Sequence, residues 1–273
     1  MLGTFLITWR EALEAALIVG ILLTYLDRIG QRRHFRYVYH GILWAVAASV
    51  GFAYLSSFVS LFFEDSGKEL FDAGIMLVAT GVLTYMVVWM HHSARELKGE
   101  IQTRTDQAVS KGKLWAIAVL AFVGVFREGI ETVLFLWGLF LQGGGLLTTS
   151  ILVSGGLLGI GVAVLMAWLF FKGFGHLDLR VFFKITGILL LFIAAGLAAS
   201  AAGKLVQAEI LSPIVYEVWD TSWLLDQHGL IGSVLAGLFG YRSNPSLLEV
   251  LVYSLYFPLV ILWLRRERHD LAQ

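Results

Sequence analysis

The sequence has no cysteine and only three prolines, and just 15% of its 273 residues are charged. Without cysteine, the chain has no disulfide bond, no thiolate metal site and no catalytic thiol. The 20 acidic and 20 basic residues balance, so the net charge gives no reason to expect a nucleic acid as a partner. Soluble domains carry about 25% charged residues. The shortage of charge therefore excludes a soluble enzyme and a disordered tail protein.

Apolar residues are abundant instead: they make up 58% of the chain, and the mean hydropathy is +0.78. A membrane-spanning helix needs about 20 mostly apolar residues. The uncharged stretch from Thr132 to Phe171 is too long for one helix, and Gln142-Gly143-Gly144-Gly145 divides it. We expect an all-α polytopic membrane protein with seven transmembrane helices, at residues 4–26, 39–63, 69–90, 114–141, 149–171, 182–202 and 247–264.

The distribution of basic residues orients these helices. The loops after the first, third and fifth spans, together with the C-terminal tail, carry 15 of the 20 basic residues, and the opposite loops carry only Lys68, Lys204 and Arg242. Because positively charged loops stay in the cytoplasm, we expect the N-terminus outside and the C-terminus in the cytoplasm. The long outer loop, residues 203–246, contains an apolar segment from Leu230 to Gly240. This segment is too short to span and is expected to form a re-entrant or interfacial helix.

Two charged motifs interrupt otherwise apolar helices. Arg10-Glu11-Ala12-Leu13-Glu14 lies in the first span, and Arg127-Glu128-Gly129-Ile130-Glu131 lies in the fourth. These two spans run in opposite directions across the membrane. The pattern predicts two inverted three-helix repeats, residues 1–91 and 114–202, with a seventh helix and cytoplasmic tail in residues 247–273. Inverted repeats are typical of transporters, whose binding site lies at the repeat interface near the midplane.

The paired glutamates of these motifs have the chemistry to bind a cation. Residues three apart on a helix share a face, so the two glutamates of each motif point the same way. Four glutamates and two arginines leave a formal charge of −2, which a bound cation or protonation would balance. An all-oxygen ligand set suits hard cations, although each arginine could instead simply lock two helices together through an ion pair. The candidate metal ligands are Glu11, Glu14, Glu128 and Glu131, with Arg10 and Arg127 as charge partners.

At these motifs the sequence resembles the high-affinity iron permeases, the oxidase-dependent iron transporter family, and most closely its bacterial EfeU-type branch. The hallmark of that family is Arg-Glu-x-x-Glu in the first and fourth spans, and the resemblance extends along the whole chain. Further matching stretches are Leu83-Thr84-Tyr85-Met86-Val87-Val88-Trp89-Met90, Ala194-Ala195-Gly196-Leu197-Ala198-Ala199, Phe239-Gly240-Tyr241, Pro245-Ser246 with Glu249, and Glu69-Leu70-Phe71 with Asp72.

This resemblance implies iron import across a bacterial inner membrane, with iron as the transported substrate and no prosthetic group. It identifies the four motif glutamates as iron ligands. It also implies a periplasmic partner, either an iron-binding protein or an oxidase or peroxidase. Both Fe²⁺ and Fe³⁺ fit the sequence as the transported species, and proton coupling through the same glutamates fits it too.

Four residues near the outer ends of the helices are candidates for a relay that passes cations inward: Glu69, Asp72, Glu249 and His228. Each also has a structural explanation. The first two lie in an initial helical turn, where acids are stabilised by the helix dipole. Ser246 and Glu249 match a capping box, and a single loop histidine is commonly a surface residue.

Two other functions fit parts of the pattern. Carboxylates do not select sharply among divalent metals, so a carrier of another cation such as Mn²⁺ would use the same motifs. A membrane di-metal carboxylate oxidase would pair glutamate with histidine three residues later, and neither motif has that histidine. We therefore expect a transporter and not an enzyme.

Overall fold

Helices account for all the regular secondary structure in the part of the chain that the computed structural model describes, residues 2–60, 62–93, 96–110, 115–142, 149–172, 179–225 and 230–270. One short 3₁₀-helix, Arg32–His34, joins the first two long helices. The α-helices are α1 (Leu2–Arg28), α2 (Phe35–Ser60), α3 (Asp65–Ser93), α4 (Glu96–Ser110), α5 (Trp115–Gln142), α6 (Thr149–Phe171), α7 (Leu179–Gln207), α8 (Leu230–Phe239) and α9 (Leu247–Asp270).

Each predicted span coincides with a long helix, so the all-α prediction is confirmed. Five of these helices, α2, α3, α6, α7 and α9, have the length and apolar composition to cross a membrane. The other two, α1 and α5, are equally long but carry the charges of the two motifs. The predicted short apolar helix is α8. Five apolar helices are enough to make the chain a multi-pass membrane protein, whereas the count of seven spans and their sidedness stay predictions.

The helix α4 was not expected from the sequence. It lies in the basic loop between the third and fourth predicted spans, and its residues are mostly polar. A search for apolar runs cannot detect such a helix. It packs against the ends of α1 and α5, where Ala108 joins a small buried cluster with Leu22 and Ile117.

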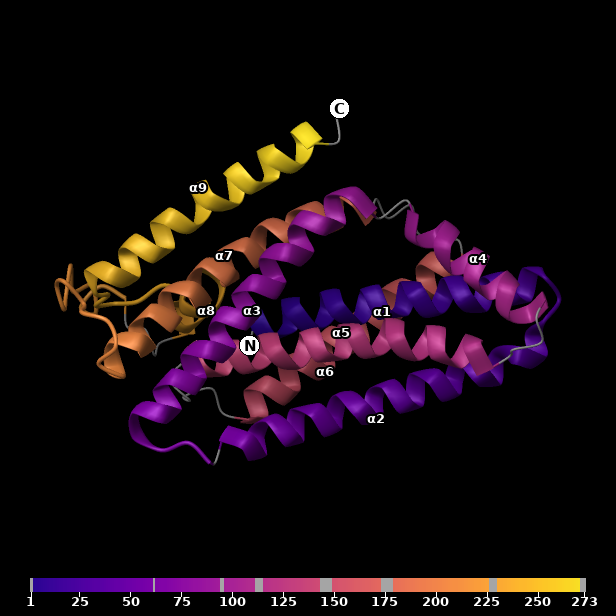
Figure 1. Cartoon of the computed structure of the whole chain (residues 1–273), viewed down its shortest axis with the longest axis horizontal. Helices are drawn as coiled ribbons and strands as arrows, with labels where there is room; N and C mark the ends of the chain where they lie inside the picture. The colour runs from indigo at the N-terminus through magenta and orange to yellow at the C-terminus, as the bar shows by residue number, and fades with distance from the viewer. Residues whose placement is uncertain are drawn as a thin grey trace.

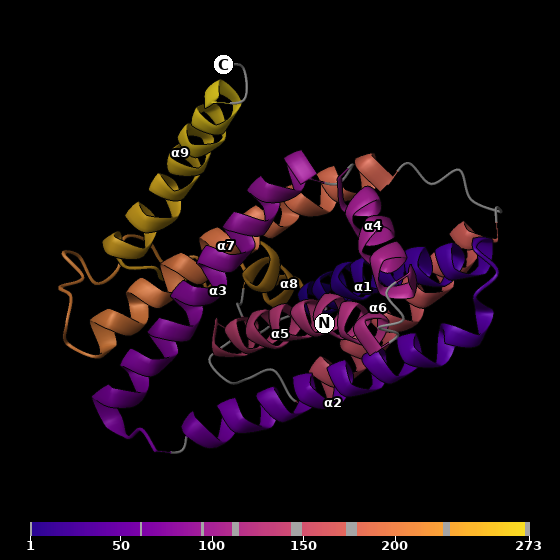
Figure 2. The same cartoon turned by 45° about the vertical axis from the view of Figure 1, so that its right-hand side comes forward.

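The helices of the two predicted halves are interlocked. The most extensive contact of α1 is with α6, and that of α2 is with α5, whereas α1 and α2 touch each other only slightly. If α1, α2 and α3 correspond to α5, α6 and α7, then the contact of α1 with α6 corresponds to the contact of α5 with α2. The same packing arrangement therefore occurs twice. The other large contacts between the halves, α3 with α7 and α1 with α5, join helices that correspond to each other. Figure 1 and Figure 2 both show α3 beside α7 and α2 beside α5.

Glycine allows both reciprocal contacts to be close. A Cβ atom at Gly41 of α2 would lie 2.3 Å from the carbonyl oxygen of Ala118 in α5. A Cβ atom at Gly159 of α6 would lie 2.7 Å from the carbonyl oxygen of Phe5 and 2.8 Å from the nitrogen of Trp9 in α1. Side chains do not fit at such distances, so small residues are required where these helix backbones cross.

The largest buried apolar cluster lies between α3 and α7 and receives side chains from α5, α8 and α9. Phe135 of α5 and Leu83 of α3 are among its fully buried members. The helix α9 packs against α7 and is the outermost helix in Figure 1 and Figure 2. A 2.7 Å hydrogen bond between Thr84 and Tyr256 also connects it to α3. The motif helices α1 and α5 therefore lie inside the bundle, with α9 at its edge.

Candidate metal centre

The first motif lies in the middle of α1 and is organised around a buried arginine. Arg10 is 0% exposed, its Nη1 donates to Glu11 Oε1 at 2.7 Å, and its Nη2 lies 2.8 Å from Glu14 Oε1. The same Nη1 donates to the Sδ atom of Met86 in α3 at 3.3 Å. One guanidinium group thus contacts both glutamates of its own motif and ties α1 to α3.

The second motif, in α5, is organised more loosely. The side chain of Arg127 is 43% exposed, and its Nε donates to Glu131 Oε1 at 3.0 Å. The glycine between the two glutamates gives room to α2, because a Cβ atom at Gly129 would lie 2.0 Å from the Oγ of Ser49. The two motifs share a sequence pattern but differ in how deeply their arginines are buried.

Three carboxyl groups from these two helices meet inside the protein. Glu11, Glu128 and Glu131 are all buried, and each offers one carboxylate oxygen within 4.8 Å of the other two. The carboxyl groups of Glu11 and Glu128 lie within hydrogen-bonding reach of each other. Each of the three has an Oε2 atom that is buried without a hydrogen-bond partner among the described residues. Buried carboxylates so close together require a proton or a cation between them.

Glu14 does not join this group of three. It lies one helical turn further along α1, where Arg10 holds it, and 17% of its side chain is exposed. The sequence predicted four glutamate ligands, and which of them bind an ion stays a prediction. The structure places oxygens of three of them within 4.8 Å of one another. Glu14 lies beside Arg10 and interacts electrostatically with Glu128 and Glu131.

The acidic pair at the start of α3 faces a lysine. The Nζ atom of Lys204, near the end of α7, lies 2.6 Å from Glu69 Oε2 and 4.0 Å from Asp72 Oδ2. Asp72 is buried, whereas Glu69 is partly exposed. The two residues predicted as a relay are therefore close together, with a resident cationic group already beside them.

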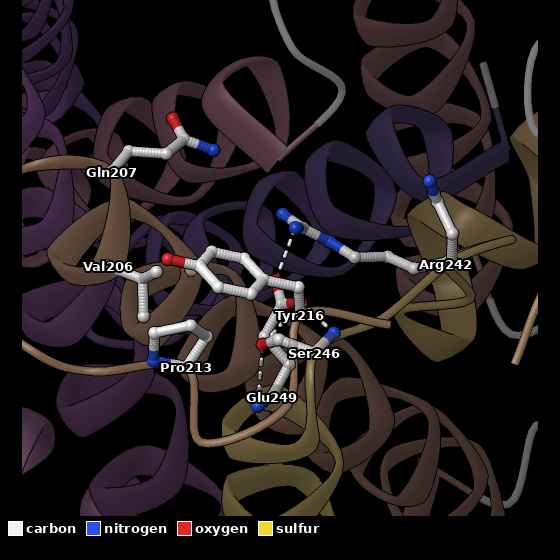
Figure 3. Close-up of a pocket in the computed structure, with 9 residues that line it drawn as sticks. Val206, Gln207, Pro213, Tyr216, Arg242, Ser246 and Glu249 are labelled. Carbon is white, nitrogen blue, oxygen red and sulfur yellow. Dashed lines mark hydrogen bonds and ion pairs between the residues drawn. The ribbon is translucent and has the colours of Figure 1, made fainter. Parts of the chain in front are cut away.

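Glu249 has partners for both of its carboxylate oxygens. Its Oε2 accepts hydrogen bonds from the N–H and hydroxyl groups of Ser246 at 2.8 and 3.0 Å, and its N–H donates to Ser246 Oγ at 3.3 Å. Its Oε1 forms an ion pair with Arg242. The capping box suggested by the sequence is therefore formed. Figure 3 shows these contacts at one side of a pocket of about 190 Å³ that Gln207 and Tyr216 also line.

The loop between α7 and α8 carries a further acidic group, Asp220. Hydrogen bonds from Ser222, through its side chain and its N–H at 2.8 Å, lower the pKa of Asp220 and keep its carboxyl group ionised. The remaining candidate for the relay, His228, lies outside the described residues.

Known proteins with similar sequences place the chain in a family. Residues 1–266 match the iron permease FTR1 family. The chain belongs to this family. It is 35% identical to the ferrous iron permease EfeU of Escherichia coli O6:K15:H31 over 258 residues, which cover 94% of this chain and 92% of that protein. It is also 35% identical to the ferrous iron permease EfeU of Yersinia pestis over 266 residues, or 96% and 93% of the two chains. No solved structure matches the chain significantly.

Membership in the iron permease family makes the chain a membrane transport protein rather than an enzyme, as the composition and motifs predicted. Iron is the cargo that the family description names. The all-oxygen chemistry of the buried carboxyl group cluster suits such a cargo.

Two residues that contact the predicted site residues were not identified from the sequence: Lys204, beside Glu69, and Met86, beside Arg10. Lys204 counted only as an outer basic residue, because nothing in the sequence links the end of α7 to the start of α3. Met86 lay in an apolar stretch, and its contact with Arg10 depends on the packing of α3 against the motif helices. Both contacts join segments far apart in sequence, so spacing alone carries no signal for them.

Proposed function

We propose that the protein imports ferrous iron across a bacterial inner membrane and binds the ion between Glu11, Glu128 and Glu131. The observation that carries this proposal is the convergence of three buried carboxylate oxygens within 4.8 Å of one another. Membership in the iron permease family and the similarity to the ferrous iron permeases EfeU support iron, in its ferrous form, as the cargo.

The combined charge of the two motifs supports a divalent ion. The four glutamates and two arginines of the motifs carry a formal charge of −2 when all are ionised, so one Fe²⁺ ion makes the site neutral. A neutral site is far less costly to bury in a membrane than a charged one. In the absence of iron, protons bound by the carboxyl groups have to neutralise this negative charge.

The transport mechanism we propose uses two inverted halves, α1–α3 and α5–α7, that move against each other around the carboxylates, with α9 as the seventh span. The reciprocal contacts of α1 with α6 and of α2 with α5 support this arrangement. With the N-terminus outside, a negative interior draws iron inward, since a divalent cation gains about 4.6 kcal/mol per 100 mV. The acidic outer residues, including Glu69 and Asp72, would gather the cation, and a periplasmic iron-binding or oxidase or peroxidase partner would supply it.

Radioactive iron uptake into proteoliposomes tests this proposal. Wild-type protein is expected to take up Fe²⁺, kept reduced with ascorbate, faster than Fe³⁺. The variants Glu11→Gln and Glu128→Gln keep the size of the side chain but remove the charge that faces the ion. Each is expected to lower uptake at least about tenfold, because even groups behind the direct metal ligands contribute about 10–100-fold to affinity.

Asp106→Asn, which also exchanges a carboxylate for an amide, is the control, because Asp106 is exposed in α4 and belongs neither to the cluster nor to the acidic outer residues. Its uptake should equal that of the wild type. Competition by excess Mn²⁺ measures selectivity, and stronger transport of Mn²⁺ than of Fe²⁺ would make the protein a manganese carrier. Normal uptake by both cluster variants would disprove the proposed site.

A further inference from the structure

Gln142, the last residue of α5, has a buried side chain whose amide group makes no hydrogen bond to any residue that the structure describes. It is 8% exposed, and neither its Nε2 nor its Oε1 has a partner among the described residues. Burying an amide without partners costs free energy, and an apolar side chain at the same place would avoid that cost. The position of Gln142 relative to the carboxylates indicates a functional role for this amide.

Gln142 lies on the same face of α5 as the two motif glutamates of that helix. The buried residues of α5 recur every three or four positions: Glu128, Glu131, Phe135, Gly138, Leu139 and Gln142. Such spacing follows one side of a helix. With a rise of about 1.5 Å per residue, the amide stands roughly 16 Å from Glu131 along the helix axis. A polar group therefore marks each end of one buried stripe.

Apolar side chains fill the stripe between these polar ends. Phe135 is fully buried and Leu139 is nearly so, and both belong to the large apolar cluster between α3 and α7. Gly138 packs tightly there, because a Cβ atom would lie 3.1 Å from a methyl carbon of Leu197. In this structure an ion could not pass from Gln142 to the glutamates without displacement of these side chains.

Two glycines bring backbone close to the amide of Gln142. A Cβ atom at Gly196 of α7 would lie 2.5 Å from Gln142 Nε2 and 2.6 Å from the Cα of Gly240. Gly240 has a φ of +66° and follows the last residue of α8, which is the usual conformation of a glycine that ends a helix. The amide thus lies beside the C-terminal end of α8.

The C-terminal end of a helix favours cations. Its last carbonyl groups lack helical N–H partners, and the helix dipole places partial negative charge there. In α8 the N–H groups of Gly240 and Tyr241 donate to the carbonyl groups of Ala236 and Leu235. The last three residues of the helix, Gly237 to Phe239, provide the carbonyl groups at its C-terminal end. Carbonyl oxygens from short helices that stop within the protein are used by transporters to coordinate cations.

From this juxtaposition we propose that Gln142 and the C-terminal turn of α8 form an outer binding position for a hydrated divalent cation, on the approach to the carboxylates. The carbonyl oxygen of Gln142 and the terminal carbonyls of α8 accept hydrogen bonds from the water molecules around the ion, or replace some of them as hard oxygen ligands. The apolar side chains of Phe135 and Leu139 separate this position from the inner site. This inference rests on the proposed function, since it adds a binding position that the cation occupies before it reaches the carboxylates.

Ferrous iron uptake into proteoliposomes, measured over a range of iron concentrations, tests the inference. Gln142→Leu has nearly the same volume but no polar atoms. It is expected to raise KM about tenfold, the effect of losing one hydrogen bond to a charged partner, while kcat changes less than about twofold. Gln142→Glu, which adds a charge at the same atoms, is expected to lower KM.

Gln207→Leu is the matched control, because Gln207 is also an outer glutamine at a helix end but is exposed. Its KM should equal that of the wild type. A wild-type KM for Gln142→Leu, together with a higher melting temperature, would show that the amide only packs and would overturn the inference. If Gln142→Leu fails to fold, Gln142→Glu decides: a lower KM supports the binding position and an unchanged KM overturns it.

Binding of Mn²⁺ to detergent-solubilised protein, measured by electron paramagnetic resonance, separates this inference from the proposed function. The Gln142→Leu variant is expected to retain Mn²⁺ binding at the carboxylates, whereas Glu11→Gln is expected to lose it. If Glu11→Gln binds and transports normally, the carboxylate site itself is wrong and the outer position falls with it. If only the Gln142 variants behave like the wild type, the carboxylate site stands alone.

Discussion

The two Arg-Glu-x-x-Glu motifs have the same sequence pattern but different surroundings. Arg10 is fully buried and contacts Glu11, Glu14 and Met86. Arg127 is 43% exposed and contacts Glu131. The first arginine is therefore buried within the bundle and ties α1 to α3, whereas the second is partly exposed and pairs with a glutamate of its own helix.

The difference shows that a repeated motif need not make two equivalent half-sites. In the second motif both glutamates reach the carboxyl group cluster, whereas in the first only Glu11 does and Glu14 stays with Arg10. The additional helices α8 and α9 also pack on α7 and have no counterpart on α3. The asymmetry of the motifs thus accompanies a wider asymmetry of the two halves.

Substitution of the two arginines should show the largest effect. Arg10→Met leaves the buried carboxylate of Glu11 and the mostly buried carboxylate of Glu14 without their counter-charge. We therefore expect a loss of about 3–5 kcal/mol in the free energy of unfolding. Arg127→Met removes a partly exposed ion pair and should cost only about 0–1 kcal/mol. Denaturant unfolding in detergent measures both, and equal losses would mean that the two arginines are equally structural.

The reciprocal helix contacts should be the next most sensitive. Gly41→Ala and Gly159→Ala each push a methyl group against backbone atoms of the partner helix, and about 1–3 kcal/mol of stability should be lost in each case. Gly51→Ala and Gly161→Ala are controls on the same helices, because a Cβ atom there meets nothing within 4 Å. If one of the two contact variants is as stable as its control, the contacts of α1–α6 and α2–α5 are not equivalent.

Iron binding should distinguish the two glutamates of the first motif. Glu11→Gln removes a member of the carboxyl group cluster and should weaken binding about tenfold or more. Glu14→Gln removes a group that lies beside Arg10, so binding should weaken about threefold or less, in proportion to a single ion pair. Equilibrium binding of radioactive Fe²⁺ measures both, and equal losses would restore the four-ligand site that the sequence alone suggests.

The smallest effect is expected at the acidic pair at the start of α3. Lys204→Met removes the cation beside Glu69 and Asp72, so the outer end becomes more negative and KM for iron should fall about twofold at low salt. The effect should vanish at high ionic strength because of screening. Lys68→Met, at an exposed position of the same acidic region, should change KM less, and a rise in KM for Lys204→Met would contradict this role.

The sequence predicted the long helices well because apolar composition and length decide where a chain can span a membrane. The break after Gln142 and the short helix α8 were predicted for the same reason, from glycines and from an apolar run that is too short. The polar helix α4 escaped because its residues carry no apolar signal. Local composition was therefore sufficient to predict the apolar helices and insufficient to predict the polar helix α4.

The candidate site was only partly predictable. The spacing of Glu128 and Glu131 placed both on one helix face, as the structure has them. Spacing could not show that the carboxyl group of Glu11 meets those of Glu128 and Glu131 while Glu14 lies beside Arg10, because that depends on how α1 packs against α3 and α5. It also gave no sign that the amide of Gln142 is buried without a partner, since in the sequence this residue only begins a glycine-rich break.

The interlocked contacts of α1 with α6 have a consequence for how the chain is made. A ribosome adds about 5–20 residues per second, so Gly159 of α6 is synthesised roughly 7 to 26 s after α1 is complete. During that time the helix carries Arg10, Glu11 and Glu14 without its main partner, and charges in an unpartnered membrane helix are costly. The insertion machinery or its lipid surroundings must shelter α1 until the second half of the chain arrives.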